Sequence, residues 1–87
     1  MIEENTIYAA MAEIIADIFM RDDIVLSPSL SARDVKGWDS FKNVEVILAT
    51  ESYFMTKLTS AEIDNLRSLG DLVRIVAQRG RLPANRS

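Results

Sequence analysis

The chain has 87 residues, of which 48% are hydrophobic and 26% charged, a balance typical of one small globular domain. It contains no cysteine and no histidine, which excludes the usual zinc ligands, thiol nucleophiles and the side chain that most often activates a serine. Residues 1–64 hold 12 acidic and 5 basic side chains, so we expect no nucleic-acid partner, because binding nucleic acid requires a basic surface.

The sequence also bears on location. No stretch approaches the ~18 apolar residues of a membrane-spanning helix, so no membrane partner is expected. The start, Met1-Ile2-Glu3-Glu4, lacks the basic residues of a signal peptide, and we therefore expect a cytoplasmic protein. Residues 1–80 are expected to form the domain, and the basic residues 81–87 a flexible tail.

The first expected element is an amphipathic helix over about residues 6–20. Its apolar side chains recur at helical spacing and form one stripe, consisting of Ile7, Met11, Ile14, Ile15 and Ile18. The pattern breaks down over residues 21–39, which predicts a long ordered loop. Scattered apolar anchors are expected in this loop at Val25, Leu26, Leu30 and Val35. Asp22-Asp23 lacks further oxygen ligands at regular spacing, so no metal site is predicted.

The second helix is expected to begin at Asp39 or Ser40, both good N-cap residues, and to end near Phe54. Two apolar arcs run along it, roughly 110° apart at about 100° per residue. One arc comprises Val46, Ile47, Thr50 and Phe54, and the other Phe41, Val44, Leu48 and Met55. A helix so widely apolar contacts several neighbours or leaves an edge for a transient partner. Lys42 falls on the remaining polar strip, where we expect it to be exposed.

Two shorter segments follow. Thr59-Ser60-Ala61-Glu62 has the spacing of a capping box, which predicts a short helix. Ser68-Leu69-Gly70-Asp71 is expected to start a last helix that ends at Gly80. No segment alternates with period two for long enough to form a sheet. The predicted fold class is therefore all-α, a four-helix bundle of three longer helices and one short helix, with a long loop between helices 1 and 2. Methionines at Met11, Met20 and Met55 are expected to fill gaps in its core.

Gly37-Trp38-Asp39-Ser40-Phe41 is the candidate functional segment. Taken alone it is a turn followed by a helix cap, the usual role of an Asp-Ser pair. A hydroxyl in the first turn of a helix also lies where the partial positive charge and free N–H groups favour a phosphate ester. The chain offers no histidine or cysteine as a base, so Ser40 is a poor catalytic nucleophile and a better target for modification by another enzyme.

Three motifs follow one another within residues 6–77. Asp39-Ser40-Phe41 begins the central helix, Leu58-Thr59 precedes the short helix, and Leu69-Gly70-Asp71-Leu72 begins the last helix. This arrangement resembles the acyl carrier protein and peptidyl carrier protein family. The family motif is Asp-Ser-Leu, and its serine receives 4′-phosphopantetheine from coenzyme A. The resemblance implies that residues 1–80 are a phosphopantetheine-binding domain with Ser40 as the attachment site. The sequence Gly-Trp-Asp-Ser resembles the motif found in carriers of specialised biosynthesis.

The resemblance implies a monomeric carrier, not an enzyme, that holds acyl or aminoacyl groups as thioesters on the arm. The implied partners are a phosphopantetheinyl transferase, an acyl- or aminoacyl-loading ligase or transferase, and downstream synthase or transferase enzymes. Their expected contacts are Asp39, Phe41, Lys42, Val44, Glu45, Leu48, Glu51 and Ile63.

Two departures from the family pattern bear on these partners. Phe41 replaces the usual leucine, and Lys42-Asn43 stands where carriers of fatty-acid synthesis have acidic residues. Two alternatives stay open at this point. In the first, the chain is a small helical interaction module that uses the apolar edge of its second helix, with Ser40 only a cap. In the second, it is a carrier-like domain that is not modified.

Overall fold

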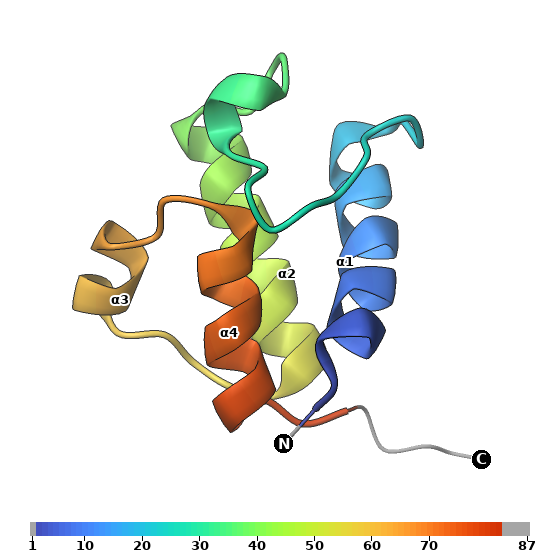
Figure 1. Cartoon of the computed structure of the whole chain (residues 1–87). Coiled ribbons are helices and arrows are strands. Elements are labelled where there is room, and N and C mark those ends of the chain that lie inside the picture. Colours follow the sequence, from blue (N-terminus) through green and yellow to red (C-terminus); the bar gives the residue numbers. More distant parts are fainter. Residues whose placement is uncertain (1, 83–87) are drawn as a thin grey trace.

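The computed structural model describes residues 2–82 (Figure 1). Its helices are α1 (Glu4–Phe19), the 3-10 helix η1 (Ala32–Asp34), α2 (Ser40–Phe54), α3 (Ser60–Asp64) and α4 (Leu69–Arg79), and the described part contains no strand. Helix α1 packs against α2 and α4, whereas the short α3 lies at the side of the bundle. The all-α bundle of three longer helices and one short helix is confirmed.

The helix ends follow the local capping chemistry. Asp39 is the N-cap of α2, and its carboxylate accepts a hydrogen bond of 2.9 Å from the Lys42 backbone N–H. Thr59 and Glu62 form the expected capping box, each side chain accepting from the other residue's backbone N–H at the start of α3. Helix α4 ends before Gly80, as expected.

The core lies where α1, α2 and α4 meet. Its largest completely buried side chains come from all three helices and include Ile7, Met11, Ile15, Val46, Phe54, Val73 and Val76. Thr50 is the one buried polar residue among those described, and its hydroxyl donates to the Val46 carbonyl at 2.7 Å. All four residues of the first predicted arc, Val46, Ile47, Thr50 and Phe54, are buried, so this arc of the second helix faces the core.

Two of the three methionines expected in the core are exposed. Met20 and Met55 follow the last residues of α1 and α2, and both adopt the left-handed conformation with φ of 55°. This conformation ends the helix, so the side chain leaves the stripe that the helical spacing predicts. Val25, expected as an anchor of the long loop, is also exposed, whereas Val35 is buried.

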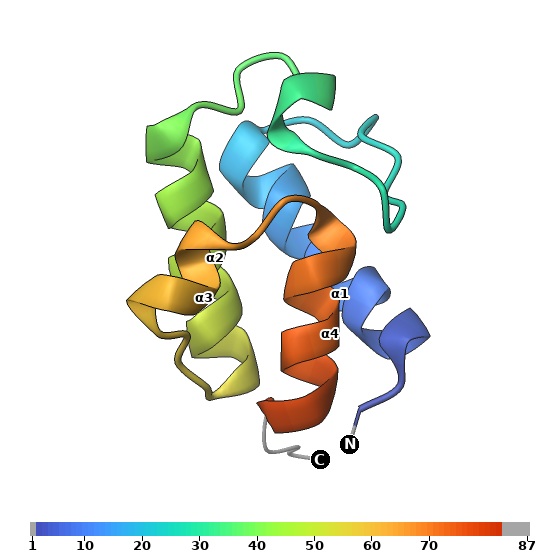
Figure 2. The ribbon, with the colours of Figure 1, turned by 60° about the vertical axis from the view of Figure 1, so that its left-hand side comes forward.

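The long loop between α1 and α2 is fixed to the start of α4 (Figure 2). The Leu69 N–H donates to the Leu30 carbonyl at 2.8 Å, and the Gly70 N–H donates to the Pro28 carbonyl at 2.9 Å. These are N–H groups of the first turn of α4, which have no acceptor within their own helix. A Cβ atom at Gly70 would lie 2.8 Å from the Pro28 oxygen, so the close seating of the loop depends on this glycine.

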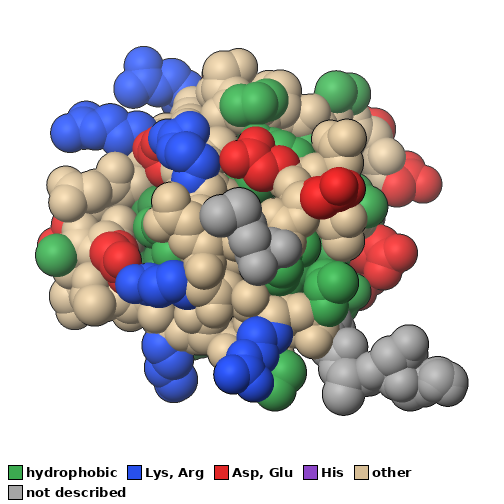
Figure 3. Space-filling view, turned by 60° about the horizontal axis from the view of Figure 1, so that its bottom comes forward, with side chains coloured by type: hydrophobic (Ala, Val, Ile, Leu, Met, Phe, Trp, Pro, Cys, Tyr) green, Lys and Arg blue, Asp and Glu red, His purple; other side chains and the backbone are tan. Residues whose placement is uncertain are grey.

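The opposite end of the bundle is closed by backbone hydrogen bonds. The Arg81 N–H donates to the Phe54 carbonyl at 2.7 Å, and the Ile2 N–H donates to the Ala77 carbonyl at 3.1 Å. Acidic and basic side chains mix over this face (Figure 3). Arg79 binds both carboxylate oxygens of Glu62 at 2.8 Å, and these hydrogen bonds lower the pKa of that carboxyl. Residues 83–87 of the expected tail lie outside the described residues.

Across residues 2–82, no helix has both the length and the apolar character needed to cross a membrane.

Candidate functional site

Ser40 is the first residue of α2, and its side chain is exposed. Because Asp39 supplies the cap, the Ser40 hydroxyl is not used for capping and forms no hydrogen bond with any other described residue. The sequence left open which of the two residues caps the helix. The structure assigns that role to Asp39, which leaves a free hydroxyl at the positive end of a helix.

Trp38 holds the segment before Ser40 in place. The chain turns at Gly37, whose φ of +91° favours glycine, and the Trp38 N–H then donates to the Val35 carbonyl at 3.1 Å. The Trp38 ring packs against Phe19 at the end of α1, with the ring centroids 5.1 Å apart. Its indole N–H donates to Oδ1 of Asn43 at 3.1 Å. Trp38 therefore joins the loop to both α1 and α2 and fixes the approach to Ser40.

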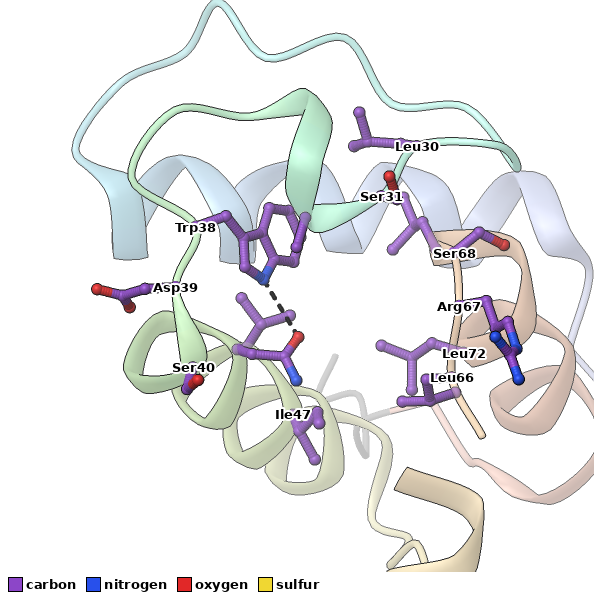
Figure 4. Close-up of a pocket in the computed structure, with 14 residues that line it drawn as sticks. Leu30, Ser31, Trp38, Asp39, Ser40, Ile47, Leu66, Arg67, Ser68 and Leu72 are labelled. Carbon is purple, nitrogen blue, oxygen red and sulfur yellow. Dashed lines mark hydrogen bonds between the residues drawn. The ribbon is translucent and has the colours of Figure 1, made fainter. Parts of the chain in front are cut away.

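A cavity of about 480 Å³ opens beside Ser40 (Figure 4). It lies between the start of α2, the segment around η1 and the connection from α3 to α4. In Figure 4, Trp38 and Ile47 lie on one side of it, and Leu66 and Leu72 on the other. Its lining is apolar at Leu30, Ala32, Trp38, Val46, Ile47, Leu66, Leu69 and Leu72, and polar or charged at Ser31, Asp39, Ser40, Asn43, Arg67 and Ser68.

Lys42 does not extend into solvent, contrary to the expectation from the helical pattern. Its side chain is half-buried and turns back to α1, where Nζ donates to the Ile18 carbonyl at 3.1 Å. The ammonium group also lies 5.8 Å from the centre of the Phe19 ring and 3.4 Å from Oε1 of Glu45. A cation at the C-terminal carbonyls of a helix is stabilised there. The angular position of Lys42 on α2 was right, but its long side chain reaches the neighbouring helix.

Two other residues expected to contact partners instead make contacts within the protein. Glu51 accepts a hydrogen bond of 2.7 Å from the Leu58 N–H and thereby fixes the connection between α2 and α3. Ile63 is half-buried and packs against the core. These contacts occupy side chains that the sequence assigned to a partner surface.

An apolar stripe remains on the outer face of α2. Phe41, Val44 and Leu48 are 72%, 52% and 58% exposed. Their spacing of three and four residues places them in one row along the helix, which begins directly after Ser40. We call these three residues the α2 stripe. With the exposed Asp39, they are the expected contact residues that the structure leaves accessible.

The site combines a free hydroxyl with few groups that could activate it. The chain contains no histidine or cysteine to activate the Ser40 hydroxyl. Residues 2–82 contain no group of three side chains that could hold a metal ion. Sequence reasoning missed the cavity, because its walls come from three separate segments, residues 30–32, 38–47 and 66–72. The one available signal was the position of Asn43, one helical turn after Ser40.

Comparisons with known proteins agree with this geometry. No protein-family model matches the chain. An acyl carrier protein from Acidothermus cellulolyticus is 30% identical over 76 residues, which cover 87% of this chain and 90% of that protein. The solution structure of a holo acyl carrier protein from Geobacter metallireducens matches the fold with a TM-score of 0.76 and 31% identity, over 80% of each chain. The chain therefore belongs to the acyl carrier protein family.

Proposed function

We propose that this protein carries acyl or aminoacyl groups as thioesters on a 4′-phosphopantetheine arm attached to Ser40. The single observation that carries the proposal is the exposed, unengaged Ser40 hydroxyl at the start of α2, beside a cavity. Acyl carrier proteins are carriers without catalytic activity, so the chain is not an enzyme. The Geobacter relative is a holo protein, and modification of this chain by the same type of group is part of our proposal.

The residues around Ser40 fit a phosphodiester. The Ser40 and Phe41 N–H groups begin α2 and have no backbone acceptor in the described chain, so they favour an anion there. The Asp39 carboxylate is held by the Lys42 N–H at the cap. A transferase would join Oγ of Ser40 to the pantetheine-bearing phosphorus of coenzyme A. The hydroxyl proton is lost, and the P–O bond of the pyrophosphate breaks and releases adenosine 3′,5′-bisphosphate. The terminal thiol of the arm supplies the thioester chemistry.

The cavity is the proposed partial shelter for the cargo. Its volume of about 480 Å³ is in the range of small-molecule sites. The apolar part of its walls, including Leu66 and Leu72 on the side facing α2, would cover part of an acyl chain. Such shelter would protect a thioester from water and still release it to the next enzyme.

We propose the α2 stripe as the contact surface for partner enzymes. It lies next to the attachment serine, where an enzyme that receives the arm must approach. A small apolar surface suits weak complexes, since a tethered cargo gains effective concentration without tight binding of its carrier. Lys42, Glu45 and Glu51 have contacts within the chain, so we assign them to the fold and keep Asp39 beside the stripe.

The proposed partners follow from this role. They are a phosphopantetheinyl transferase, a loading ligase or transferase, and downstream synthases or transferases, acting on a monomeric carrier in the cytoplasm. The α2 stripe is apolar, and the negative charge of Glu45 is paired with Lys42. The surface that this protein offers to partners at the start of α2 is therefore not strongly acidic. This difference from carriers of fatty-acid synthesis, together with the sequence Gly37-Trp38-Asp39-Ser40, supports a role in a specialised biosynthetic pathway.

The experiment is intact-mass measurement after incubation with coenzyme A and a promiscuous phosphopantetheinyl transferase. The wild-type protein should gain one phosphopantetheine, and Ser40→Ala should gain none and stay folded. Ser60→Ala is the matched control, because Ser60 is also the first residue of a helix capped by its predecessor. It should be modified like the wild type.

The same measurement separates the alternatives. A folded wild-type protein that several transferases fail to modify would favour a helical interaction module or an unmodified carrier-like domain. Modification that persists in Ser40→Ala would move the attachment site to another residue.

A further inference from the structure

Asn43 has an amide group whose orientation is fixed by Trp38. The indole nitrogen can only donate a hydrogen bond, so the atom it contacts at 3.1 Å must be the amide oxygen of Asn43 (Figure 4, dashed line). The two N–H donors of the same amide then point away from the indole. They have no acceptor among residues 2–82, and Asn43 lines the cavity.

The cavity lining mixes polar and apolar side chains, which suits a phosphopantetheine arm better than a plain hydrocarbon chain. Its apolar walls are interrupted by polar and charged side chains, which include Asn43 on α2 and Arg67 and Ser68 just before α4. Ser68 makes no side-chain capping hydrogen bond, so its hydroxyl is also available. A phosphopantetheine arm likewise alternates a dimethyl group and methylene groups with a hydroxyl and two amides. Polar groups at such spacing need hydrogen-bond partners when they leave water.

We propose that Asn43 holds the arm in the cavity by donating a hydrogen bond to the arm's first amide carbonyl. This inference rests on the proposed attachment at Ser40. Asn43 is three residues after Ser40 on α2, which places the two Cβ atoms about 5–6 Å apart. The first amide carbonyl follows the phosphate after a short link with two methyl groups and a hydroxyl, so it lies within reach of the Asn43 amide.

The apolar part of that link has a place to pack. Trp38 and Ile47 border the cavity on the side formed by the start of α2, and the dimethyl group of the arm would lie against them. Asn43 is then a positioning residue. It selects a docked arm with sheltered cargo over an arm extended into solvent, and a partner enzyme must break one neutral hydrogen bond to draw the arm out.

The test is NMR spectroscopy of the holo protein, prepared with a transferase and coenzyme A from ¹⁵N,¹³C-labelled protein. In the wild type, isotope-filtered spectra should show NOEs from the arm's methyl groups to the Trp38 ring. The Asn43 side-chain NH₂ resonances should shift between the apo and holo forms. Methyl resonances identical to those of free pantetheine, without NOEs to the cavity, would overturn the proposal.

Two variants test the donor itself. Asn43→Asp keeps an acceptor for the Trp38 indole and removes both N–H donors, so the NOEs should be lost while the indole resonance keeps its hydrogen-bonded position. Asn43→Leu removes the donors without adding charge, and the NOEs should again be lost. Asn5→Asp, on the exposed side of α1, adds the same charge elsewhere and should leave the NOEs unchanged.

The outcomes separate this inference from the function on which it rests. Unchanged NOEs in both Asn43 variants would show that Asn43 does not hold the arm. A mass increase at Ser40 with a free arm would refute docking and leave the carrier function intact. No mass increase would refute attachment, and with it the docked arm.

Discussion

The two ends of the bundle close over the core in different ways. At the end away from Ser40, Phe54 is completely buried, and its carbonyl accepts a 2.7 Å hydrogen bond from the Arg81 N–H. At the Ser40 end, a loop, a cavity of about 480 Å³ and the exposed α2 stripe stand in place of such closure. The comparison indicates that the Phe54 end is tightly packed, whereas the Ser40 end leaves a cavity and an exposed apolar stripe beside the proposed attachment residue.

Close backbone approach occurs at both ends, with different results. A Cβ atom at Gly80 would lie 2.9 Å from the Val76 oxygen and 3.1 Å from Cβ of Phe54, so the backbone at the end of α4 lies directly against the core. A Cβ atom at Gly70 would meet the Pro28 backbone, so α4 is pressed against a loop. That loop carries Leu30 into the cavity wall. The close approach at Gly80 closes the core, whereas the close approach at Gly70 positions the loop that lines the cavity.

The largest expected effect is at the closed end. Phe54→Ala removes a completely buried aromatic side chain and should lower the free energy of unfolding by about 3–5 kcal/mol. Such a loss is a large fraction of the total stability of a small domain. Chemical denaturation of the two proteins measures the difference.

Leu48→Ala is the matched control for that substitution, because Leu48 lies on the same helix and is exposed. Its free energy of unfolding should change by no more than about 0.5 kcal/mol. If Phe54→Ala and Leu48→Ala had similar denaturation midpoints, stability would not be concentrated at the closed end.

The local part of this fold could be predicted from the sequence. The capping box of Thr59 and Glu62, the start of α2 and the inward arc of that helix each depend on residues within a few positions of one another. The start of α1 at Glu4, two residues before the expected position, falls within the usual uncertainty of helix ends. The position of Ser40 at the start of this helix was expected from the same local signals, whereas its role as attachment site was implied by the resemblance to carrier proteins.

The rest depended on distant contacts. The cavity forms because the Leu69 N–H binds the Leu30 carbonyl, a pairing between residues 39 positions apart that no periodic pattern encodes. Lys42 was placed correctly on α2, yet its ammonium group binds the Ile18 carbonyl of another helix. Helical spacing gives the direction in which a side chain leaves the backbone, but not the neighbour that a long side chain reaches.

The second prediction concerns the loop at the open end. Gly70→Ala should gain up to about 1 kcal/mol from the better helix propensity of alanine. The new Cβ atom would lie 2.8 Å from the Pro28 oxygen, and displacing the backbone should cost about 1–3 kcal/mol, so the net effect is destabilising. Denaturation and amide hydrogen exchange at residues 69 and 70 would measure it, and both amides should exchange faster.

Gly80→Ala is the control for Gly70→Ala, because its Cβ atom would contact Val76 and Phe54 at the opposite end of the bundle. It should lower stability without a selective loss of protection at residues 69 and 70. Equal exchange rates at residue 69 in the wild type and in Gly70→Ala would mean that the loop adapts without leaving α4.

The smallest expected effect is at Lys42, which joins α1 to α2 two residues after Ser40. Lys42→Met keeps the apolar stem and removes the ammonium group, and with it the hydrogen bond to Ile18 and the ion pair with Glu45. The free energy of unfolding should fall by about 1 kcal/mol, because the group is partly exposed and acts mainly on the C-terminal carbonyls of α1. Denaturation at low and high salt measures this loss.

Lys36→Met removes an exposed lysine from the loop before Ser40 and is the control for net charge near the site. It should leave the free energy of unfolding unchanged within about 0.5 kcal/mol. Because the α2 stripe is intact in both variants, a transferase should modify Ser40 at similar rates in each, and these rates should match the wild type. Slower modification of Lys42→Met with undiminished stability would be the opposite result. It would mean that the ammonium group leaves Ile18 to contact the enzyme, and Lys42 would then belong to the partner surface after all.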